Sequence, residues 1–422
     1  MSPTLTTVNR RRLLQLGGAT AAAALLAPRQ AAAAPFVAAN AAATNATAAT
    51  KATAFVAPDP AEYRTRAVAA YNAMQGYLYA PPAADGTDTG LYKEETSPAL
   101  NSGARPYSYL WPFTRAHAGT LDLYGPAADR LTGLAKYWDG TGYASYVVAL
   151  NQGGGDRFYD DNAWSGLNLM RAHRLTPGGN AVALARAKAV FKFINAGWDT
   201  NRKHPAPGGV FWVQASWSRD RNTCSNAPSA ELGLRLYQAT ARTAADRKAF
   251  LTPATDMYAW VDRYLRSDGR NETTAGLYWD HIDLNGNIEK TQWSYNQGTM
   301  IGAGVLLARE TGDGSYLARA LSTAGLALDH YARVGYFTQE PAFNAIFFRN
   351  LLLLASADAQ YLEKTLTAMQ GYVDQAYAQN RGADGLYYFP AGDTSARLLD
   401  QGAMVEILAC LATAAAQYDT LV

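Results

Sequence analysis

Apolar residues recur with helical spacing along most of the chain from residue 59 onward. The stretch from Met257 to Tyr264 follows the i, i+3, i+4, i+7 spacing that places side chains on one face of an α-helix. The stretches Leu317–Leu328 and Leu362–Val373 have the same spacing, and all three carry polar residues on the opposite face. We therefore expect each of them to be an outer helix that buries one face.

Neighbouring stretches are apolar on every side, as in Met300–Ala308, Ile346–Ala355 and Met404–Ala416. Helices of that kind are buried. Buried and amphipathic helices alternate along the chain in six pairs, which predicts two concentric rings, an all-α (α/α)6 toroid of six helical hairpins. A superhelix of helical hairpins is the alternative. The twelve expected helices span residues 60–76, 104–123, 126–138, 161–174, 179–197, 227–241, 245–266, 294–311, 314–333, 342–356, 358–379 and 397–418.

The loops that enter the buried helices are long and rich in polar and aromatic residues, whereas those that leave them are short, such as 311–314. Functional side chains concentrate on loops that a rigid scaffold holds. We therefore expect one functional face, at the N-terminal ends of the inner helices.

Composition narrows the classes of partner. The chain has 422 residues, 49% of them apolar, with a net charge of +2, and no basic block follows the N-terminal leader. Nucleic acid and anionic membranes are therefore poor partners. No glycine motif for phosphates is present, so we expect no cofactor. The two cysteines, Cys224 and Cys410, have no metal-ligand spacing, and their pairing stays open.

The N-terminus has the pattern of an export signal. The residues Arg10, Arg11 and Arg12 precede an apolar run, Leu16–Ala27, that is too short and too rich in alanine for a membrane span. We predict a twin-arginine signal peptide at 1–34, a disordered Ala/Thr-rich linker at 35–58, and one catalytic domain at 59–422. The mature protein is then a secreted bacterial monomer without a membrane anchor.

Two adjacent carboxylates form the strongest candidate site. Asp160 and Asp161 follow the glycine run 153–155 and are flanked by Tyr159 and Trp164, where a loop becomes a helix. Neighbouring buried carboxyls titrate as a coupled pair, one holding its proton more tightly. One ionised and one protonated carboxyl is what glycosidic cleavage requires. The alternative is a helix-capping aspartate beside a solvated one.

The other entering loops bring aromatic rings together with amides and carboxylates. Aromatic rings bind the C–H face of a sugar, and the polar groups bind its hydroxyls, so a polar and aromatic cleft is expected. Asp280 could bind a sugar or cap a turn. The candidate substrate-binding residues are Trp164, Trp212, Asn226, Asp280, Tyr295, Asn296, Gln297 and Phe343.

Other chemistries find little support in the sequence. The histidines are scattered and we predict no metal site; Asp283, Asn285 and Asn287 are more simply a turn than a calcium loop. We expect Arg349, in a very apolar stretch, to pair with a buried structural partner. No motif for a nucleophilic serine or cysteine is present.

The motif 159–164, Tyr-Asp-Asp-Asn-Ala-Trp, resembles the tandem-aspartate signature of glycoside hydrolase family 76, the α-1,6-mannanases. The segments 208–212, 224–228, 295–298 and 343–349 resemble the same family in the same order. One departure is Asn344-Ala345, where the family pattern leads us to expect Lys-Gly.

The resemblance implies an (α/α)6 barrel and retaining hydrolysis of α-1,6-mannosidic bonds in α-mannan. It implies Asp160 as nucleophile and Asp161 as general acid/base, with Trp164, Asn226, Asp280, Asn296 and Gln297 near the mannose subsites. Sequence spacing does not decide the stereochemistry, because side chains on adjacent Cα atoms can diverge to either carboxyl separation.

Three further functions stay open: an exo-acting α-mannosidase, a mannan transglycosylase, and a non-catalytic mannan-binding protein on the same fold. Product sizes separate the first two from an endo-mannanase. A binding protein would hold glycan equally well with both aspartates changed. The natural mannan, the number of subsites and the tolerance of branches are also open.

Overall fold

The computed structural model describes residues 55–82, 85–97, 105–126, 128–150, 152–270 and 273–422. The chain divides into two units, Met1–Val56 and Ala57–Val422, and the second contains all the helices described below. The predicted signal peptide and all but the last residues of the predicted linker lie outside the described residues. Among the described helices, none combines the length and the apolar character that crossing a bilayer requires.

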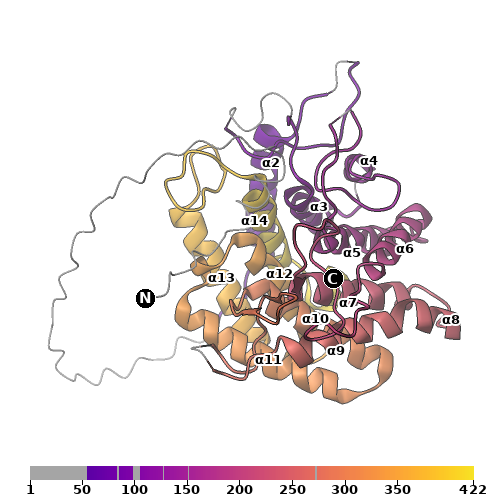
Figure 1. The fold of residues 1–422 in the computed structure, drawn as a ribbon. Coiled ribbons are helices and arrows are strands. Elements are labelled where there is room, and N and C mark those ends of the chain that lie inside the picture. Colours follow the sequence, from indigo (N-terminus) through magenta and orange to yellow (C-terminus); the bar gives the residue numbers. More distant parts are fainter. Residues whose placement is uncertain (1–54, 83–84, 98–104, 127, 151, 271–272) are drawn as a thin grey trace, which may run out of the picture. The chain divides into compact units, whose positions relative to one another are not determined.

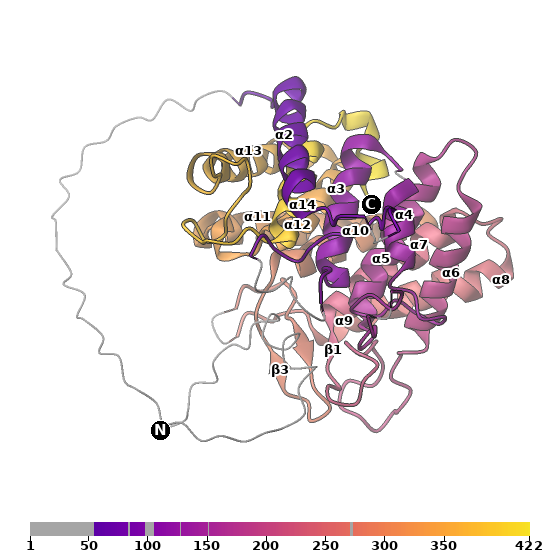
Figure 2. The same ribbon diagram turned by 90° about the horizontal axis from the view of Figure 1, so that it is seen from above.

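In the described part of the chain, six helices have nearly every residue buried. Each contacts the next in chain order, and the last packs against the first, so they close into a ring (Figures 1 and 2). This closure confirms the predicted barrel and contradicts an open superhelix. These inner helices are α3 (Leu110–Tyr124), α5 (Tyr159–Leu175), α7 (Thr223–Gln238), α10 (Ser294–Thr311), α12 (Pro341–Ala355) and α14 (Leu398–Leu411).

The outer helices bury one face against this ring, as their amphipathic patterns predict. The buried residues of α11 repeat at the spacing of one helix face; they are Ala320, Thr323, Ala324, Ala327, Leu328 and Tyr331. The outer helices are α2 (Pro60–Leu78), α4 (Ala128–Ala135), α6 (Ala181–Asn195), α9 (Thr252–Tyr264), α11 (Gly314–Val334) and α13 (Leu362–Gln379). The short α8 (Ala244–Asp246) and the π-helical turn η1 (Arg247–Leu251) lead directly into α9.

Several helix ends differ from the sequence prediction; the helix expected at 104–123, for example, begins at Leu110. The helix expected at 227–241 begins at Thr223, because the backbone N–H of Thr223 donates to Asp280 O at 2.8 Å and its hydroxyl donates to Trp279 O at 2.6 Å. The helix expected to run to residue 418 ends at Leu411, and a separate 3-10 segment, η4 (Ala415–Leu421), follows. Arginines of the inner helices bind carbonyls of this segment, as in Arg171 Nε to Thr420 O at 3.3 Å.

Buried charges inside the ring are paired. The side chain of Arg349 contacts both carboxylate oxygens of Asp122, and its Nε donates to Glu406 Oε1 at 2.8 Å. Arg115 also pairs with Glu406, and Arg171 pairs with Asp122. The predicted structural role of Arg349 is therefore confirmed.

A repeated amide contact fixes how the inner helices begin. The fourth residue of five inner helices is an asparagine or glutamine whose side chain binds the loop that precedes the helix. In α5, the N–H of Tyr143 donates to Asn162 Oδ1 at 2.8 Å, and Asn162 Nδ2 donates back to Tyr143 O at 2.9 Å. The amides of this series are Asn162, Asn226, Gln297, Asn344 and Gln401.

Four of these amides bind both the N–H and the C=O of a single loop residue, and also the carbonyl four residues earlier in the chain. The loop residues held in this way are Tyr143, Val210, Tyr278 and Tyr387. Two of them end the tripeptide Gly-Leu-Tyr, which recurs at 90–92, 276–278 and 385–387. The hairpins are thus structural repeats, although no strict sequence repeat was predicted.

A small antiparallel sheet joins two of the entering loops, which the all-α prediction missed. It has the order β1-β2-β3, with β1 (Arg221–Asn222), β2 (His281–Ile282) and β3 (Ile288–Glu289). The turn between β2 and β3 is closed by Asp283, whose Oδ1 accepts from the N–H groups of Asn285 and Asn287, both at 2.8 Å. These contacts agree with the predicted turn.

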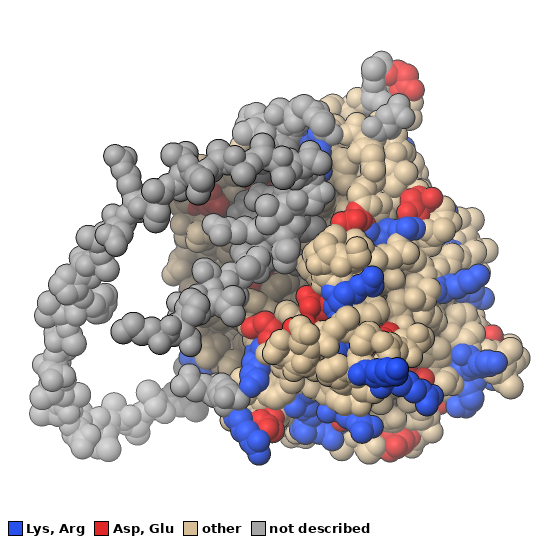
Figure 3. Space-filling model, viewed as in Figure 1, with Lys and Arg blue, Asp and Glu red and all other residues tan. Residues whose placement is uncertain are grey.

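On the face shown in Figure 3, Lys and Arg side chains lie among Asp and Glu side chains over the described surface. No large area of the described surface on this face carries charge of one sign alone. That distribution agrees with the small net charge of +2. It gives no electrostatic reason to expect a polyanion on this face.

Candidate functional site

Asp160 and Asp161 lie in the first turn of α5, the second and third residues of the helix, at the position where the sequence predicts them. Both side chains are buried. The N-cap residue is Phe158, whose side chain makes no capping hydrogen bond, so neither aspartate is the N-cap of this helix. The free N–H groups and the dipole of a helix N-terminus favour negative charge at this position.

Donors surround the Asp160 carboxylate. Its Oδ1 accepts the backbone N–H of Asp161 at 3.0 Å, and its Oδ2 accepts Trp212 Nε1 at 3.3 Å. The thiol of Cys224, in the first turn of α7, lies 3.5 Å from the same Oδ2. Donors to both oxygens stabilise the ionised carboxylate. This is the charge state that an attacking carboxylate needs.

The loop that carries Trp212 is held by backbone pairing. The N–H of Tyr159 donates to Trp212 O at 2.9 Å, and the N–H of Trp212 donates to Asp220 O at 2.8 Å. Gly209 has a φ of +80°, and a Cβ there would lie 2.6 Å from the ring of Trp260. The glycine therefore lets the loop turn closely over α9 and deliver Trp212 to Asp160.

The aromatic residues next to the two aspartates in sequence pack against other aromatic rings. Tyr159 stacks on Phe193 of α6, with ring centroids 4.9 Å apart. Trp164 is buried one turn further along α5, 5.7 Å from the ring of Trp111, and lines a cavity of about 20 Å³ inside the ring of helices. Trp164 thus supports the first turn from the interior, and substrate contact by it stays a prediction.

Asn226 and Gln297 belong to the loop-holding amides. Asn226 Oδ1 accepts the N–H of Val210 at 2.8 Å, and its Nδ2 donates to Asn222 O at 2.8 Å. Gln297 makes the equivalent bonds to Tyr278. The structure therefore gives both amides a positioning role, and their predicted contact with substrate is untested.

Asp280 anchors a second polar group on the same face. Its Oδ2 accepts from His281 Nδ1 at 2.9 Å, and its Oδ1 accepts from Asn296 Nδ2 at 3.3 Å. Asn296 is in the first turn of α10 and fully buried, and its Oδ1 has no hydrogen-bond partner. Since the N–H of Thr223 donates to Asp280 O, this group lies next to the start of α7, whose Cys224 touches Asp160.

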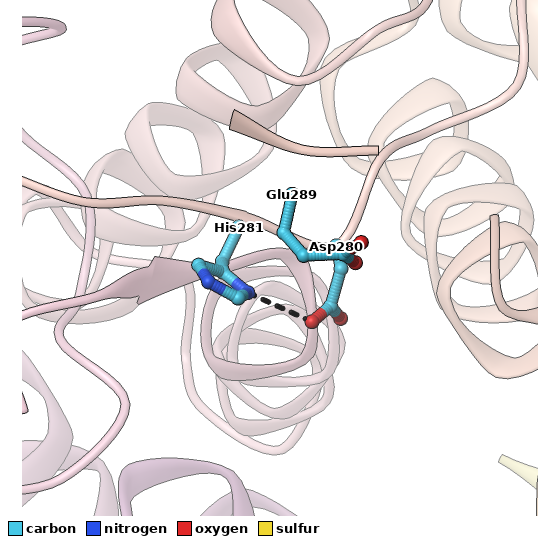
Figure 4. Close-up of side chains that lie close together, drawn as sticks. All are labelled: Asp280, His281 and Glu289. Carbon is cyan, nitrogen blue, oxygen red and sulfur yellow. Dashed lines mark hydrogen bonds and ion pairs between the residues drawn. The ribbon is translucent and has the colours of Figure 1, made fainter. Parts of the chain in front are cut away.

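Asp280, His281 and Glu289 form the one candidate metal cluster among the described residues, with one ligand atom from each lying within 4.8 Å of the others (Figure 4). The sequence prediction missed it, because Glu289 reaches His281 only through the pairing of β2 with β3. Both oxygens of Glu289 accept from Thr291, at 3.1 and 2.9 Å. His281 Nδ1 and both oxygens of Glu289 therefore each already take part in a hydrogen bond.

The charge on His281 follows from its neighbours. Burial alone would lower the pKa of the imidazole, but the hydrogen bond and charge of Asp280, together with Asp220 and Glu289, raise it above 6.5. The neighbouring carboxylates therefore favour the protonated form of the His281 imidazole. The sequence, in which the histidines are scattered, did not predict this contact.

Tyr295 and Phe343 form a stacked pair from neighbouring inner helices, with ring centroids 4.1 Å apart at an interplanar angle of 17°. Trp293 packs edge-on against Phe343 at 5.5 Å. Both Tyr295 and Phe343 lie in first turns, like Asp160 and Asn296. The structure thus brings the predicted candidates from α5, α10 and α12 to one face of the ring.

Two residues of this region were not among the predicted site residues. Cys224 reaches Asp160 because α7 begins earlier than predicted. Trp217 packs against Trp212 and Phe158. It is one of the aromatic residues that the sequence places in the entering loops, but it was not among the predicted site residues. Cys224 and Cys410 are both buried and form no disulfide with each other, which settles the pairing that the sequence left open.

Comparisons with known proteins agree with this geometry. The sequence profile of glycosyl hydrolase family 76 matches residues 64–388. Mannan endo-1,6-alpha-mannosidase DCW1 of Candida glabrata is 28% identical over 183 residues, which are 41% of this chain and 38% of that protein. Mannan endo-1,6-alpha-mannosidase DFG5 of Saccharomyces cerevisiae is 26% identical over 250 residues, 54% of this chain and 52% of that protein. The matches therefore span about half or less of these relatives' own length.

Solved structures share the fold. A family 76 mannosidase of Bacteroides thetaiotaomicron VPI-5482 has a TM-score of 0.68 at 24% identity, over 83% of this chain and 98% of that chain. An inactive α-1,6-mannanase variant of Salegentibacter sp. HEL1_6, with two consecutive aspartates changed to asparagine and α-1,6-mannotriose bound, has a TM-score of 0.65 at 20% identity, over 83% and 99% of the two chains. Since the family profile covers most of the chain, this protein belongs to glycosyl hydrolase family 76.

Proposed function

We propose that this chain is an endo-α-1,6-mannanase that hydrolyses α-mannan with retention of configuration. The observation that carries the proposal is the environment of Asp160, a buried carboxylate at a helix N-terminus with donors on both oxygens and a second carboxylate beside it. The names of the curated relatives and the mannotriose bound to a related α-1,6-mannanase support the choice of substrate.

In the proposed first step, an oxygen of Asp160 attacks the anomeric carbon while the bond from that carbon to the leaving oxygen breaks. Asp161 gives its proton to the leaving oxygen. In the second step, Asp161 takes a proton from water, whose oxygen displaces Asp160 from the same carbon. The hydrogen bonds of Asp160 with Trp212 and Cys224 orient its carboxylate for attack and for departure.

The remaining first-turn residues are proposed to form mannose subsites. Asp280 and Asn296 offer a carboxylate and an unpaired amide oxygen that accept from sugar hydroxyls. The rings of Trp212, Tyr295 and Phe343 offer apolar surface for the C–H face of a pyranose. Asn226 and Gln297 act through the loops that they hold, and Trp164 acts through the first turn of α5.

The test is turnover of linear α-1,6-mannan, measured as new reducing ends, by the wild type and by Asp160→Asn and Asp161→Asn. Loss of a nucleophile is expected to lower kcat by at least about a thousandfold, and loss of a general acid by about 10²- to 10⁴-fold. Asp400→Asn is the matched control, because Asp400 lies in the first turn of another inner helix and pairs with Arg397 at 2.7 Å. Undiminished turnover by either Asp160→Asn or Asp161→Asn would remove the proposed pair.

Product analysis separates the alternative activities. An endo-mannanase releases long oligosaccharides early, an exo-mannosidase releases mannose alone, and a transglycosylase makes products longer than its substrate. Proton NMR of the first products reports the anomer, and an initial α product supports retention. Binding without any product, unchanged in both aspartate variants, would instead indicate a mannan-binding protein.

Export is part of the proposal. The paired arginines and apolar run in residues 10–27 motivate it. Replacing Arg11 and Arg12 together by lysine is expected to retain the protein inside bacterial cells, and fractionation measures this.

A further inference from the structure

Trp217 stands apart from the other tryptophans. All nine tryptophans of the chain are within the described residues, and Trp217 is the single exposed one, with 46% of its surface accessible. It lies in the loop between α6 and α7, which also carries Trp212. A lone exposed aromatic residue is ordinary on a protein surface. The contacts of this ring are what require explanation.

The exposed ring is held in place. The indole Nε1 of Trp217 donates to Asp156 Oδ2 at 2.8 Å, and the ring makes edge-on contacts with Phe158 at 5.9 Å and Trp212 at 5.7 Å between centroids. Asp156 and Phe158 belong to the loop that enters α5, and Trp212 belongs to the same loop as Trp217, so contacts from two loops hold the indole without burying it. Because a fixed side chain loses little rotamer freedom when a ligand binds, this arrangement favours binding.

Trp217 connects to the candidate catalytic carboxylate through one intervening ring. Trp212 contacts Trp217 on one side and donates to Asp160 Oδ2 at 3.3 Å on the other. A sugar chain that has one residue at Asp160 and extends toward the surface on this side therefore meets Trp217. Because the ring of Trp212 lies between Asp160 and Trp217, we expect the sugar that stacks on Trp217 to be a different residue from the one that reacts at Asp160.

We propose that Trp217 is the platform of an outer subsite that binds a mannosyl residue beyond the bond being cleaved. This inference rests on the proposed mannanase function and deepens it. The C–H face of a pyranose stacks on the accessible indole, while the edge of the ring stays bonded to Asp156. The subsite makes the enzyme favour long chains over short ones and leaves the chemistry at Asp160 unchanged.

The test compares Trp217→Ala with wild type on α-1,6-linked mannose oligosaccharides of increasing length and on the polymer. The variant is expected to lose about tenfold in kcat/KM on the polymer and on the longest oligosaccharides, equivalent to about 1.4 kcal/mol. On the shortest cleaved substrate it is expected to stay within about twofold, because that substrate does not reach the platform. The loss appears in KM, with kcat nearly unchanged.

Three variants isolate the stacking surface. Trp217→Phe keeps an aromatic face and is expected to recover most of the affinity for long chains. Asp156→Ala frees the ring and is expected to give an intermediate loss. Tyr124→Ala is the matched control, because Tyr124 is a comparably exposed aromatic residue, at 49%, at the opposite end of an inner helix. It is expected to behave as wild type at every substrate length.

The outcomes distinguish this proposal from the function on which it rests. An equal loss by Trp217→Ala on every substrate length would mean that the ring only supports Trp212, and no loss at any length would remove the subsite; either result overturns the inference while the mannanase function stands. If the wild type neither binds nor cleaves α-1,6-mannan, the proposed function fails and the subsite with it.

Discussion

Glu231 provides a quantitative test of how charge is arranged inside the ring of helices. This residue of α7 is fully buried, and its Oε1 accepts no hydrogen bond. A Cβ on Gly302 of α10 would lie 2.3 Å from Glu231 Oε1 and 1.9 Å from Asn350 Oδ1, so the two oxygens face the same point. Two acceptors that face each other need a donor, and a protonated Glu231 supplies one.

Burial raises the pKa of Glu231 well above 4.5, although Arg235 and Arg349 act in the opposite direction. The folded state therefore binds this proton more tightly than the unfolded state does. Stability from this group is greatest below pH 4.5 and falls as the pH rises from 4.5 through the folded-state pKa. In the unfolded state the glutamate has its ordinary pKa of 4.5 and is ionised at pH 7. Keeping Glu231 protonated in the folded state at pH 7 therefore lowers the free energy of unfolding by at most about 3.4 kcal/mol.

Glu231→Gln replaces the protonated acid with a neutral amide of the same shape, which keeps a donor for Asn350. We expect the variant to be more stable than wild type by up to about 3 kcal/mol at pH 7 and equal to it near pH 4. Urea unfolding across this pH range, followed by circular dichroism, measures the difference in the free energy of unfolding.

Glu406→Gln is the matched control, because Glu406 is also a fully buried glutamate on an inner helix but pairs with Arg115 and Arg349. Removing one partner of a buried ion pair costs about 3–5 kcal/mol, so the two variants should move in opposite directions at pH 7. A Glu231→Gln variant that is less stable than wild type at pH 7, or a difference that does not change with pH, refutes the reasoning.

Two further predictions concern close packing and metal. Gly302→Ala places a Cβ within 2.3 Å of two oxygens and should destabilise the protein by about 1–3 kcal/mol or more. Gly371→Ala is the control in outer helix α13, where a Cβ meets no atom within 4 Å, and it should stabilise the protein by up to about 1 kcal/mol. Equal urea midpoints for the two variants would contradict this description of the packing. Prolonged dialysis against a chelator should leave mannan turnover unchanged, because His281 Nδ1 and both oxygens of Glu289 already take part in hydrogen bonds. Activity that is lost on dialysis and recovered with one divalent cation would instead show a metal site.

The helices and their order were predictable because apolar periodicity reports which faces are buried. Stretches that are apolar on every side, such as Met300–Ala308, form inner helices in the structure. Stretches that are apolar on one face only form outer helices. Helix ends were harder. Pro228 marks a plausible helix start in sequence, yet bonds to the loop at Trp279 and Asp280 extend α7 back to Thr223. Those bonds are tertiary contacts that local patterns do not encode.

The candidate site was predictable in its position and less so in its neighbours. Chain adjacency suggested Tyr159 and Trp164 as walls around the two aspartates. Tyr159 instead packs on Phe193 of α6. Trp164 lies on the same helix face as the two aspartates, three and four residues after them, and packs against Trp111 beside the interior cavity. The contacts with Asp160 come from Trp212 and Cys224, more than fifty residues away in sequence.

The amides at the fourth position of the inner helices explain how irregular loops can produce an ordered site. Each of four amides binds the N–H and the C=O of one loop residue, which fixes both the axial position and the rotation of the helix start relative to its loop. Once the fourth residue is directed at the loop, the second and third residues are directed elsewhere, since successive side chains on an α-helix are about 100° apart. Asp160, Asp161, Tyr295, Asn296 and Phe343 all occupy those second and third positions. The same constraint that closes each hairpin therefore selects which side chains can meet a substrate.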